Sequence, residues 1–330
     1  MLFPGKEEAN AMDINELSGM LNGYFGWNKA RMICFTCMLV SLFKVRTVNL
    51  KELACGFESE ARLASRHKRI RRFFREFTIS FARLAGWIIT FFDLDQTSLF
   101  LAIDRTNWRW GKQDINILML SVVYRGIALP LLWELLPKRG NSNTAERMTL
   151  MKRFIKQFGK ERIGCLLADR EFVGKEWFSW LRKEKIPFCI RIKSNTLTTN
   201  SLGFPVNVDA LFYGLKSGEQ RVLQGARKLW DQKIHLSALR LQDGELLILA
   251  TDSAHDSPII LYGKRWEIET LFSCLKSRGF NFEDTHVTKP ERIAKLIALL
   301  AIGFCWAYKA GEWLHEQKPI RIMKHGRKSV

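Results

Sequence analysis

Acidic residues are scarce in this chain. Its 330 residues include 52 lysines and arginines but only 33 aspartates and glutamates, so the formal net charge is +19. An imbalance of this size concerns the partners of a protein rather than its fold. It favours a polyanion as partner, which means nucleic acid or, as a weaker alternative, an anionic membrane surface.

Disulfide patterns and long hydrophobic runs are also missing. The seven cysteines are scattered and follow no recognisable secretory leader, which favours free thiols and a cytoplasmic location. Cys34 and Cys37 form a lone C-x-x-C without a second ligand pair, so we expect no zinc site there. The longest apolar runs, Leu296 to Ala307 and Ile127 to Leu136, are too short to span a bilayer and predict core, so we expect no membrane partner.

The stretch from Tyr262 to Lys276 carries polar residues at helical spacing. Tyr262, Arg265, Glu269 and Lys276 are separated by three, four and seven residues, which predicts that they share one face of a helix. The other face is apolar and suited to packing. The pattern is open to two interpretations, a solvated face with ordinary ion pairs or a face that holds a charged ligand.

Two short apolar runs end in aspartate and favour the second interpretation. They are SLFLAID, which ends at Asp104, and IGCLLAD, which ends at Asp169. A buried strand that ends in aspartate places a carboxylate at a sheet edge, where open α/β sheets bind ligands. Together with Glu269 they form an acidic trio suited to two Mg²⁺ ions, because hard cations prefer oxygen ligands.

With these residues the sequence resembles the DDE transposases of bacterial insertion sequences, in particular the insertion-sequence-four family. That family carries a Tyr-x2-Arg-x3-Glu-x6-Lys signature, which Tyr262, Arg265, Glu269 and Lys276 match at every spacing. The resemblance covers roughly residues 99 to 305. It implies that Asp104, Asp169 and Glu269 are the catalytic acids and the ligands of two Mg²⁺ ions, for which Mn²⁺ can substitute. Glu267 lies close by, but the spacing from Arg265 selects Glu269.

The resemblance also implies the reaction and the partners. The expected activity is cleavage of the terminal inverted repeats of an insertion sequence and joining of the 3′-hydroxyl ends to target DNA. The expected partners are both of these double-stranded DNAs and a second copy of the chain within the DNA complex. The host is then a bacterium, with the protein on its nucleoid when bound to DNA. Tyr262, Arg265 and Lys276 suit phosphate binding, and Arg105 and Arg170 either contact phosphate or offset carboxylate charge.

A basic helix is predicted from Arg62 to Arg83. It contains eight basic residues against the single acid Glu76, while its apolar residues recur at helical spacing. Such a face can neutralise several phosphates, and Arg66, Arg69 and Arg72 are the candidates that we select. A solvated charge run and a membrane-surface helix are the alternatives.

The remaining patterns predict an α/β fold that is ribonuclease-H-like, with a β-rich insertion. Strands at 99–104, 115–124, 127–136, 164–169 and 187–193 alternate with helices at 145–158 and 175–185, an order in which the first and fourth strands lie side by side. Trp230 lies in the insertion and has two interpretations. It either stacks on an extruded base or is a packed aromatic residue.

These segments predict five parts. They are an all-α DNA-binding domain (1–98), the first part of the catalytic core (99–193), the insertion (194–257), the C-terminal helices of the core (258–316) and a basic tail (317–330). Two alternatives to a transposase remain open. One is a catalytically silent or repurposed DNA-binding protein, and the other is a metal-dependent nuclease of the same fold.

Overall fold

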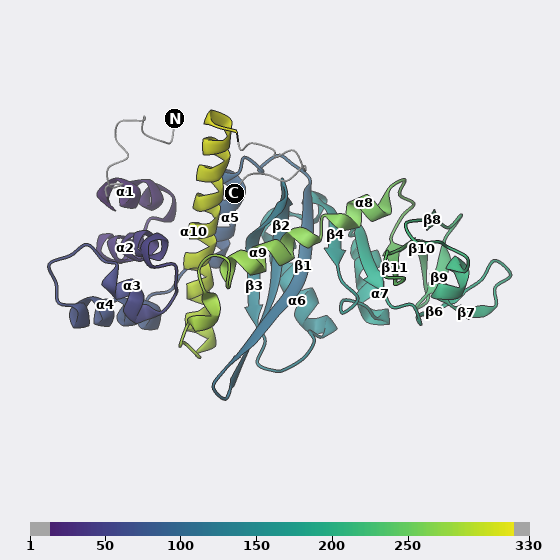
Figure 1. Ribbon diagram of the computed structural model, residues 1–330, viewed down its shortest axis with the longest axis horizontal. Helices are drawn as coiled ribbons and strands as arrows, with labels where there is room; N and C mark the ends of the chain where they lie inside the picture. The colour runs from purple at the N-terminus through teal and green to yellow at the C-terminus, as the bar shows by residue number, and fades with distance from the viewer. Residues whose placement is uncertain (1–13, 320–330) are drawn as a thin grey trace. The chain divides into compact units, whose positions relative to one another are not determined.

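The computed structural model describes residues 14–319, which divide into two compact units (Figure 1). The helical unit comprises the described residues up to Ile88 together with those from Ser273 onward, and the sheet unit is Ile89–Phe272. Most of the expected basic tail, at 320–330, lies outside the described residues.

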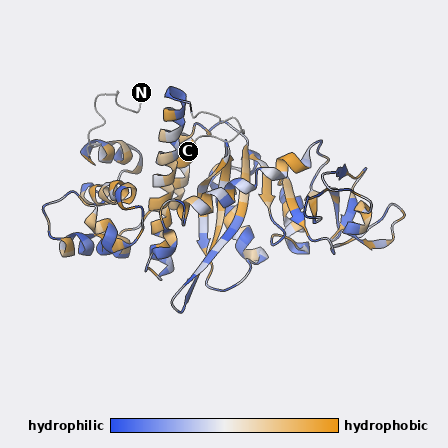
Figure 2. Cartoon of the chain, in the orientation of Figure 1, coloured by the Kyte–Doolittle hydropathy of each residue, from blue (hydrophilic) through white to orange (hydrophobic). Residues whose placement is uncertain are grey.

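The helical unit is built from local signals that the sequence displays. Its helices are α1 (Ile14–Phe25), α2 (Lys29–Val45), α3 (Leu50–Cys55), α4 (Leu63–Glu76), most of α5 (Phe81–Phe91), the end of α9 and α10 (Pro290–Gln317). The side chains of Asn28 and Asn49 accept hydrogen bonds from the backbone at the starts of α2 and α3. Figure 2 shows α4 mainly in hydrophilic colours, but Ile70, Phe73 and Phe74 are buried on its inner face.

The basic helix is shorter than expected. It ends at Glu76, and the backbone of Phe77 is extended. The Ser80 hydroxyl then accepts a hydrogen bond from the backbone N–H of Arg83, which begins α5 as a separate helix. The predicted continuous helix to Arg83 is therefore wrong in its last turn and a half.

Helix α10 lies in the helical unit. It packs against α2 and α4, and Lys295 donates a hydrogen bond to the carbonyl of Phe74 at 3.0 Å. The apolar run from Leu296 to Cys305 is buried. By length and composition alone, α10 is also the one described helix that could cross a membrane, although 61% of its most apolar window is buried within the protein.

The sheet unit contains a mixed sheet of nine strands. Its strands are β1 (Leu99–Trp110), β2 (Gln113–Tyr124), β3 (Ile127–Leu135), β4 (Ile163–Ala168), β5 (Phe188–Ile192), β8 (Gln220–Val222), β9 (Arg227–Leu229), β10 (Gln232–Arg240) and β11 (Leu246–Thr251). The order is β3-β2-β1-β4-β5-β11-β10-β8, with β9 paired to β10. Strands β1, β4 and β5 are parallel, whereas the other pairs are antiparallel. The predicted adjacency of the first and fourth strands is confirmed.

Helices pack on this sheet and connect its parallel strands. Helix α6 (Thr144–Phe158) packs against β2 and β3, α7 (Lys175–Glu184) contacts α6 and β10, and α8 (Pro258–Gly263) contacts β5, β10 and β11 (Figure 1). Asn143 begins α6, the helix predicted at 145–158, through a reciprocal capping box with Glu146.

The expected insertion is not a separate body. Its strands β10 and β11 extend the main sheet, because β11 pairs with β5 along Cys189 to Ile192. Only β6 (Leu197–Thr199) and β7 (Pro205–Asn207), a small sheet of their own, stand apart among the described strands. The reason is that the backbone N–H and C=O groups along the edge of β5 need hydrogen-bond partners. Direct pairing with another apolar strand satisfies them best.

Candidate active site

The two aspartates meet at the edge of the parallel strands. Strand β1 pairs with β4 as far as Ile103 and Ala168, so the next residues, Asp104 and Asp169, lie side by side at the carboxyl edge. The expectation that β1 ends at Asp104 is wrong, because β1 continues in a hairpin with β2 to Trp110. Asp104 nevertheless opens toward the edge, since β1 loses β4 as its neighbour there.

The signature segment consists of two short helices joined by a turn and is not a single helix. Helix α8 ends at Gly263, and α9 (Trp266–Leu275) begins after a tight turn in which the N–H of Arg265 bonds to the carbonyl of Tyr262 at 2.9 Å. The predicted single face is therefore wrong. The turn instead directs the Arg265 side chain inward, where only 4% of it is exposed.

Arg265 joins two of the expected catalytic acids. Its Nη1 atom donates to Oδ2 of Asp104 at 3.1 Å, and its Nη2 atom donates to Oε1 of Glu269 at 2.5 Å. Tyr262 lies on the other side and donates its hydroxyl to Oδ1 of Asp169 at 3.4 Å. Five predicted residues, Asp104, Asp169, Tyr262, Arg265 and Glu269, thus form one connected cluster.

Burial dominates the electrostatics of this cluster. The pKa of Asp104 is raised to about 6, mainly by burial. The Arg105 N–H and Arg265 lower this pKa, and the nearby carboxylates of Asp169 and Glu171 raise it. Burial likewise raises the pKa of the Tyr262 hydroxyl, which stays neutral and acts as a donor. Burial alone would lower the pKa of Arg265, but Tyr262, Asp104 and Glu269 hold it above its ordinary value.

Glu267 and Glu269 have different tasks although they are two residues apart. Oε2 of Glu267 accepts a hydrogen bond from the backbone N–H of Tyr124 at 3.1 Å, so this carboxylate fastens α9 to the end of β2. Burial raises the pKa of Glu267, and these backbone bonds lower it. Glu269 contacts Arg265 instead, which agrees with the residue selected from the signature spacing.

The acids have the chemistry of a divalent-cation site. Two adjacent carboxylates, one with a raised pKa, provide the oxygen donors that a hard cation stabilises. Among residues 14–319, however, no three acidic, histidine or cysteine side chains are grouped closely enough to hold a metal ion. The guanidinium of Arg265 lies between Asp104 and Glu269 and supplies positive charge where a cation would supply it.

The two arginines that follow the aspartates are engaged with other acids. Arg105 pairs with Glu171 at 3.2 Å, and Arg170 pairs with Glu245 at 3.1 Å. Glu171 also accepts a hydrogen bond from the Ser142 hydroxyl at 3.1 Å. The sequence reasoning missed Glu171, although its position two residues after Asp169 was a signal that could have found it.

Lys276 and Trp230 each have partners of their own. Lys276 follows α9 in the helical unit and pairs with Glu283 at 2.8 Å. Trp230 and Asp231 form the two-residue turn between β9 and β10, both with left-handed backbone angles. The Trp230 ring packs 4.7 Å from that of Phe178, which is the contact expected of a packed aromatic residue.

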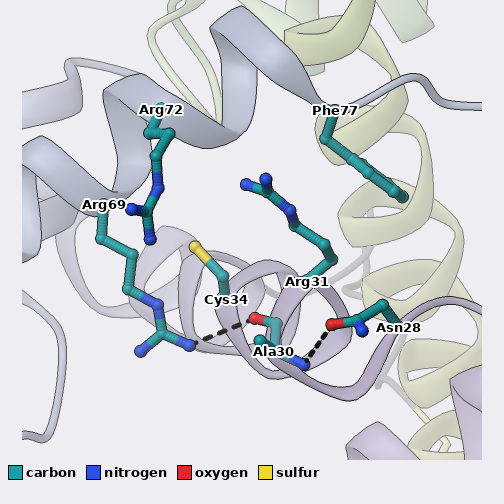
Figure 3. Close-up of a pocket in the computed structure, with 7 residues that line it drawn as sticks. All are labelled: Asn28, Ala30, Arg31, Cys34, Arg69, Arg72 and Phe77. Carbon is teal, nitrogen blue, oxygen red and sulfur yellow. Dashed lines mark hydrogen bonds between the residues drawn. The ribbon is translucent and has the colours of Figure 1, made fainter.

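The three arginines selected on α4 differ in their surroundings. Arg66 donates to the carbonyl of Phe57 at 2.6 Å and is half-buried. Figure 3 shows Arg69 and Arg72 around a pocket together with Arg31 of α2, which the sequence reasoning missed. Arg69 donates to the carbonyl of Ala30 at 3.3 Å. Arg69 and Arg72 are thus available to an anion, while Arg66 holds the fold together.

Comparison with known families decides which family the chain belongs to. The family described as "Transposase DDE domain" matches residues 95–306, which is more than half of the chain. The chain belongs to the DDE transposase family. DDE transposases cleave DNA and transfer strands, and they depend on divalent metal ions. The match contains Asp104, Asp169, Glu269 and the whole signature segment.

The chain is similar to several solved structures, three of which follow. A piggyBac transposase synaptic complex with hairpin DNA is 13% identical, with a TM-score of 0.45 over 86% of this chain and 68% of that chain. Endonuclease V from Bacillus subtilis is 11% identical, with a TM-score of 0.28 over 76% and 96% of the two chains. The catalytic domain of human endonuclease V is 14% identical, with a TM-score of 0.27 over 67% and 90%. No protein of curated function matches the sequence.

Proposed function

We propose that this DDE transposase is a cut-and-paste enzyme of the insertion-sequence-four type. It binds the terminal inverted repeats of its element, cleaves the DNA at the ends and joins the 3′-hydroxyls to target DNA. One observation supports this most directly. The parallel pairing of β1 with β4 brings Asp104 beside Asp169, and Arg265 connects Asp104 to Glu269.

Asp104, Asp169 and Glu269 would hold two divalent cations, Mg²⁺ or in its place Mn²⁺. When bound, such ions stabilise the charge that develops on a phosphodiester and ease deprotonation of the attacking oxygen. In the first step a water attacks phosphorus and the bond to the 3′-oxygen breaks, which frees a 3′-hydroxyl. In the second step that hydroxyl attacks a target phosphate, and another 3′-oxygen leaves.

The side chains around the acids position the DNA for these steps. Tyr262 is a neutral donor beside Asp169, and Arg265 offers a planar fork that fits a phosphate once it releases a carboxylate. Burial keeps water away from both. Lys276, beyond the end of α9, serves as a further phosphate contact, and Arg170 is exposed enough to do the same.

The helical unit would recognise the terminal repeats. Arg69 and Arg72 line a pocket on α4 and would contact phosphates there. Two copies of the chain would hold the two ends together during transfer, and the protein would act in the bacterial cytoplasm on the nucleoid. A nuclease of the same fold and a silent DNA-binding protein remain the competing functions.

A plasmid that carries the element's flanking ends tests the proposal. Purified protein with Mg²⁺ is expected to produce excised and joined DNA, whereas Glu269→Ala and EDTA are expected to abolish both products. Glu267→Ala is the matched control, because it removes a carboxylate from the same helix that accepts hydrogen bonds from the backbone of Tyr124 and Gly126. Cleavage without joining would identify a nuclease, and binding without cleavage would identify a silent DNA-binding protein. Retained cleavage in Glu269→Ala would refute the assigned acid.

A further inference from the structure

A second basic pocket lies within the helical unit, away from Arg69. It has a volume of about 480 Å³ and forms where α3 and α4 meet the turn that precedes α10. Its lining includes Lys51 of α3 and both His67 and Arg71 of α4. The turn and the start of α10 contribute Thr285, Lys289 and Arg292. Residues more than 200 positions apart in the sequence therefore share one cavity.

The charge of this pocket is one-sided. Lys51, Arg71, Lys289 and Arg292 line it, and its lining contains no aspartate or glutamate. Within residues 14–319, none of these four side chains forms an ion pair with an acid. Asp284, an acid in the turn before α10, contacts His286 instead, with 2.8 Å between Oδ1 of Asp284 and Nε2 of His286. A pocket with uncompensated positive charge favours an anionic ligand.

Two buried polar atoms in the pocket lining lack partners. Thr285 is fully buried, yet its Oγ1 atom has no hydrogen-bond partner among the described residues, and neither has Nε of Arg292. Buried polar groups are normally satisfied, so unpaired ones call for a missing partner. Helix α10 begins here with Lys289 as a cap that makes no side-chain hydrogen bond, and its positive end adds to the field.

The geometry points to a phosphate of the DNA backbone as the ligand of this pocket. The assignment rests on the proposed function, which supplies DNA as the partner. Continuity of the basic surface favours DNA over a free anion. Arg71 and His67 also line an adjoining groove with Arg72, and Arg72 in turn lines the pocket beside Arg31. A duplex that follows α4 would thus contact phosphates from the start of α2 to the start of α10.

The salt dependence of DNA binding by the full chain tests this assignment. We would measure the affinity for a fluorescently labelled 30-base-pair duplex at several KCl concentrations. Lys289→Gln/Arg292→Gln removes two charges that belong to this pocket and not to α4. Each phosphate contact contributes about 0.9 to the slope of log K against log[KCl], so the slope is expected to become shallower by roughly one to two. Lys152→Gln/Lys183→Gln, which removes two exposed charges from the sheet unit, is expected to leave the slope unchanged.

Thr285→Val provides a variant without a charge change. It keeps the shape of the side chain and removes only the unpaired hydroxyl, so we expect about fivefold to tenfold weaker binding at an unchanged slope. Its melting temperature is expected to equal or exceed that of the unaltered chain. A loss of affinity caused by unfolding would lower that temperature instead.

Three outcomes would overturn the assignment. The first is a slope in Lys289→Gln/Arg292→Gln equal to that of the unaltered chain, and the second is an equal change of slope in the control variant Lys152→Gln/Lys183→Gln. The third is a melting temperature that inorganic phosphate raises only when Lys289 and Arg292 are both present, while the slope for DNA does not depend on them. The last result would identify a free-phosphate site. Failure of the unaltered chain to bind DNA at all would refute the proposed function itself.

Discussion

Nη1 of Arg265 lies 3.1 Å from Oδ2 of Asp104, although 161 residues separate the two in the sequence. The same guanidinium reaches Glu269 and leaves its Nε atom buried without a partner among the described residues. A single cation therefore compensates two of the three expected metal-binding acids. This arrangement determines how the site should respond when Arg265 or one of the two acids is replaced.

Arg265→Gln is expected to strengthen binding of Mn²⁺ to the DNA-free protein. The guanidinium opposes a second cation at the same carboxylates, so its removal should raise the affinity by about tenfold, the effect of a unit charge a few ångströms away in a partly screened site. Electron paramagnetic resonance of free Mn²⁺ measures this. Arg170→Gln, which removes an exposed charge next to Asp169, is the control. Unchanged or weaker Mn²⁺ binding in Arg265→Gln would show that the arginine does not compete with the metal.

Asp104 is expected to make the metal-free protein less stable as the pH rises. Its pKa is about 6 in the folded protein and near 3.8 in the unfolded chain, so folding favours the protonated form. The stabilisation that it provides is complete below pH 3.8 and is lost as the pH rises through 6. At pH 8, Asp104→Asn should therefore have an unfolding free energy, measured by urea titration, that is about 3 kcal/mol higher than that of the unaltered chain. The difference should vanish near pH 4, and a constant difference across this range would contradict the shifted pKa.

Glu267→Ala and Glu269→Ala are expected to separate stability from catalysis. Loss of Glu267 leaves the backbone N–H of Tyr124 without its acceptor and should cost about 1–2 kcal/mol of unfolding free energy. Loss of Glu269, whose side chain is 42% exposed, should cost less but abolish strand cleavage. Urea titration and a cleavage assay on the same samples provide both readouts. The reverse pattern would exchange the roles of the two glutamates.

Trp230→Ala is expected to lower the unfolding free energy by about 2 kcal/mol. The change removes the ring that packs on Phe178 and leaves a space beside it. At equal concentrations of folded protein, binding of hairpin-ended DNA should be unchanged. Unchanged stability together with lost hairpin binding would instead show that Trp230 stacks on a base. Trp230→Phe, which keeps an aromatic ring, should retain most of the stability.

The sequence predicted features that depend on near neighbours along the chain. The helix predicted at 145–158 is confirmed as α6 (Thr144–Phe158), because its start depends on the side chain of Asn143, which binds a backbone group only three residues away. The strands β2, β3 and β4 were predicted for a similar reason. A strand that is buried on both faces is apolar along most of its length, and the sequence shows this directly.

Features that depend on distant partners were predicted less well. The break between α8 and α9 was missed because the spacing of Tyr262, Arg265 and Glu269 fits a continuous helix. The pairing of β11 with β5 was missed as well. Glu171 escaped notice because its partner Arg105 is 66 residues away.

The sequence alone determined the basic character of the protein and the order of its strands, and it selected Asp104, Asp169 and Glu269 as the candidate acids. These properties follow from composition, periodicity and motif spacing, which need no partner elsewhere in the chain. Only the tertiary structure decided that Arg265 lies between Asp104 and Glu269 and that Thr285 and Arg292 share a cavity with Arg71. Such contacts form when strand pairing and helix packing bring distant segments together and burial then fixes which polar groups face one another.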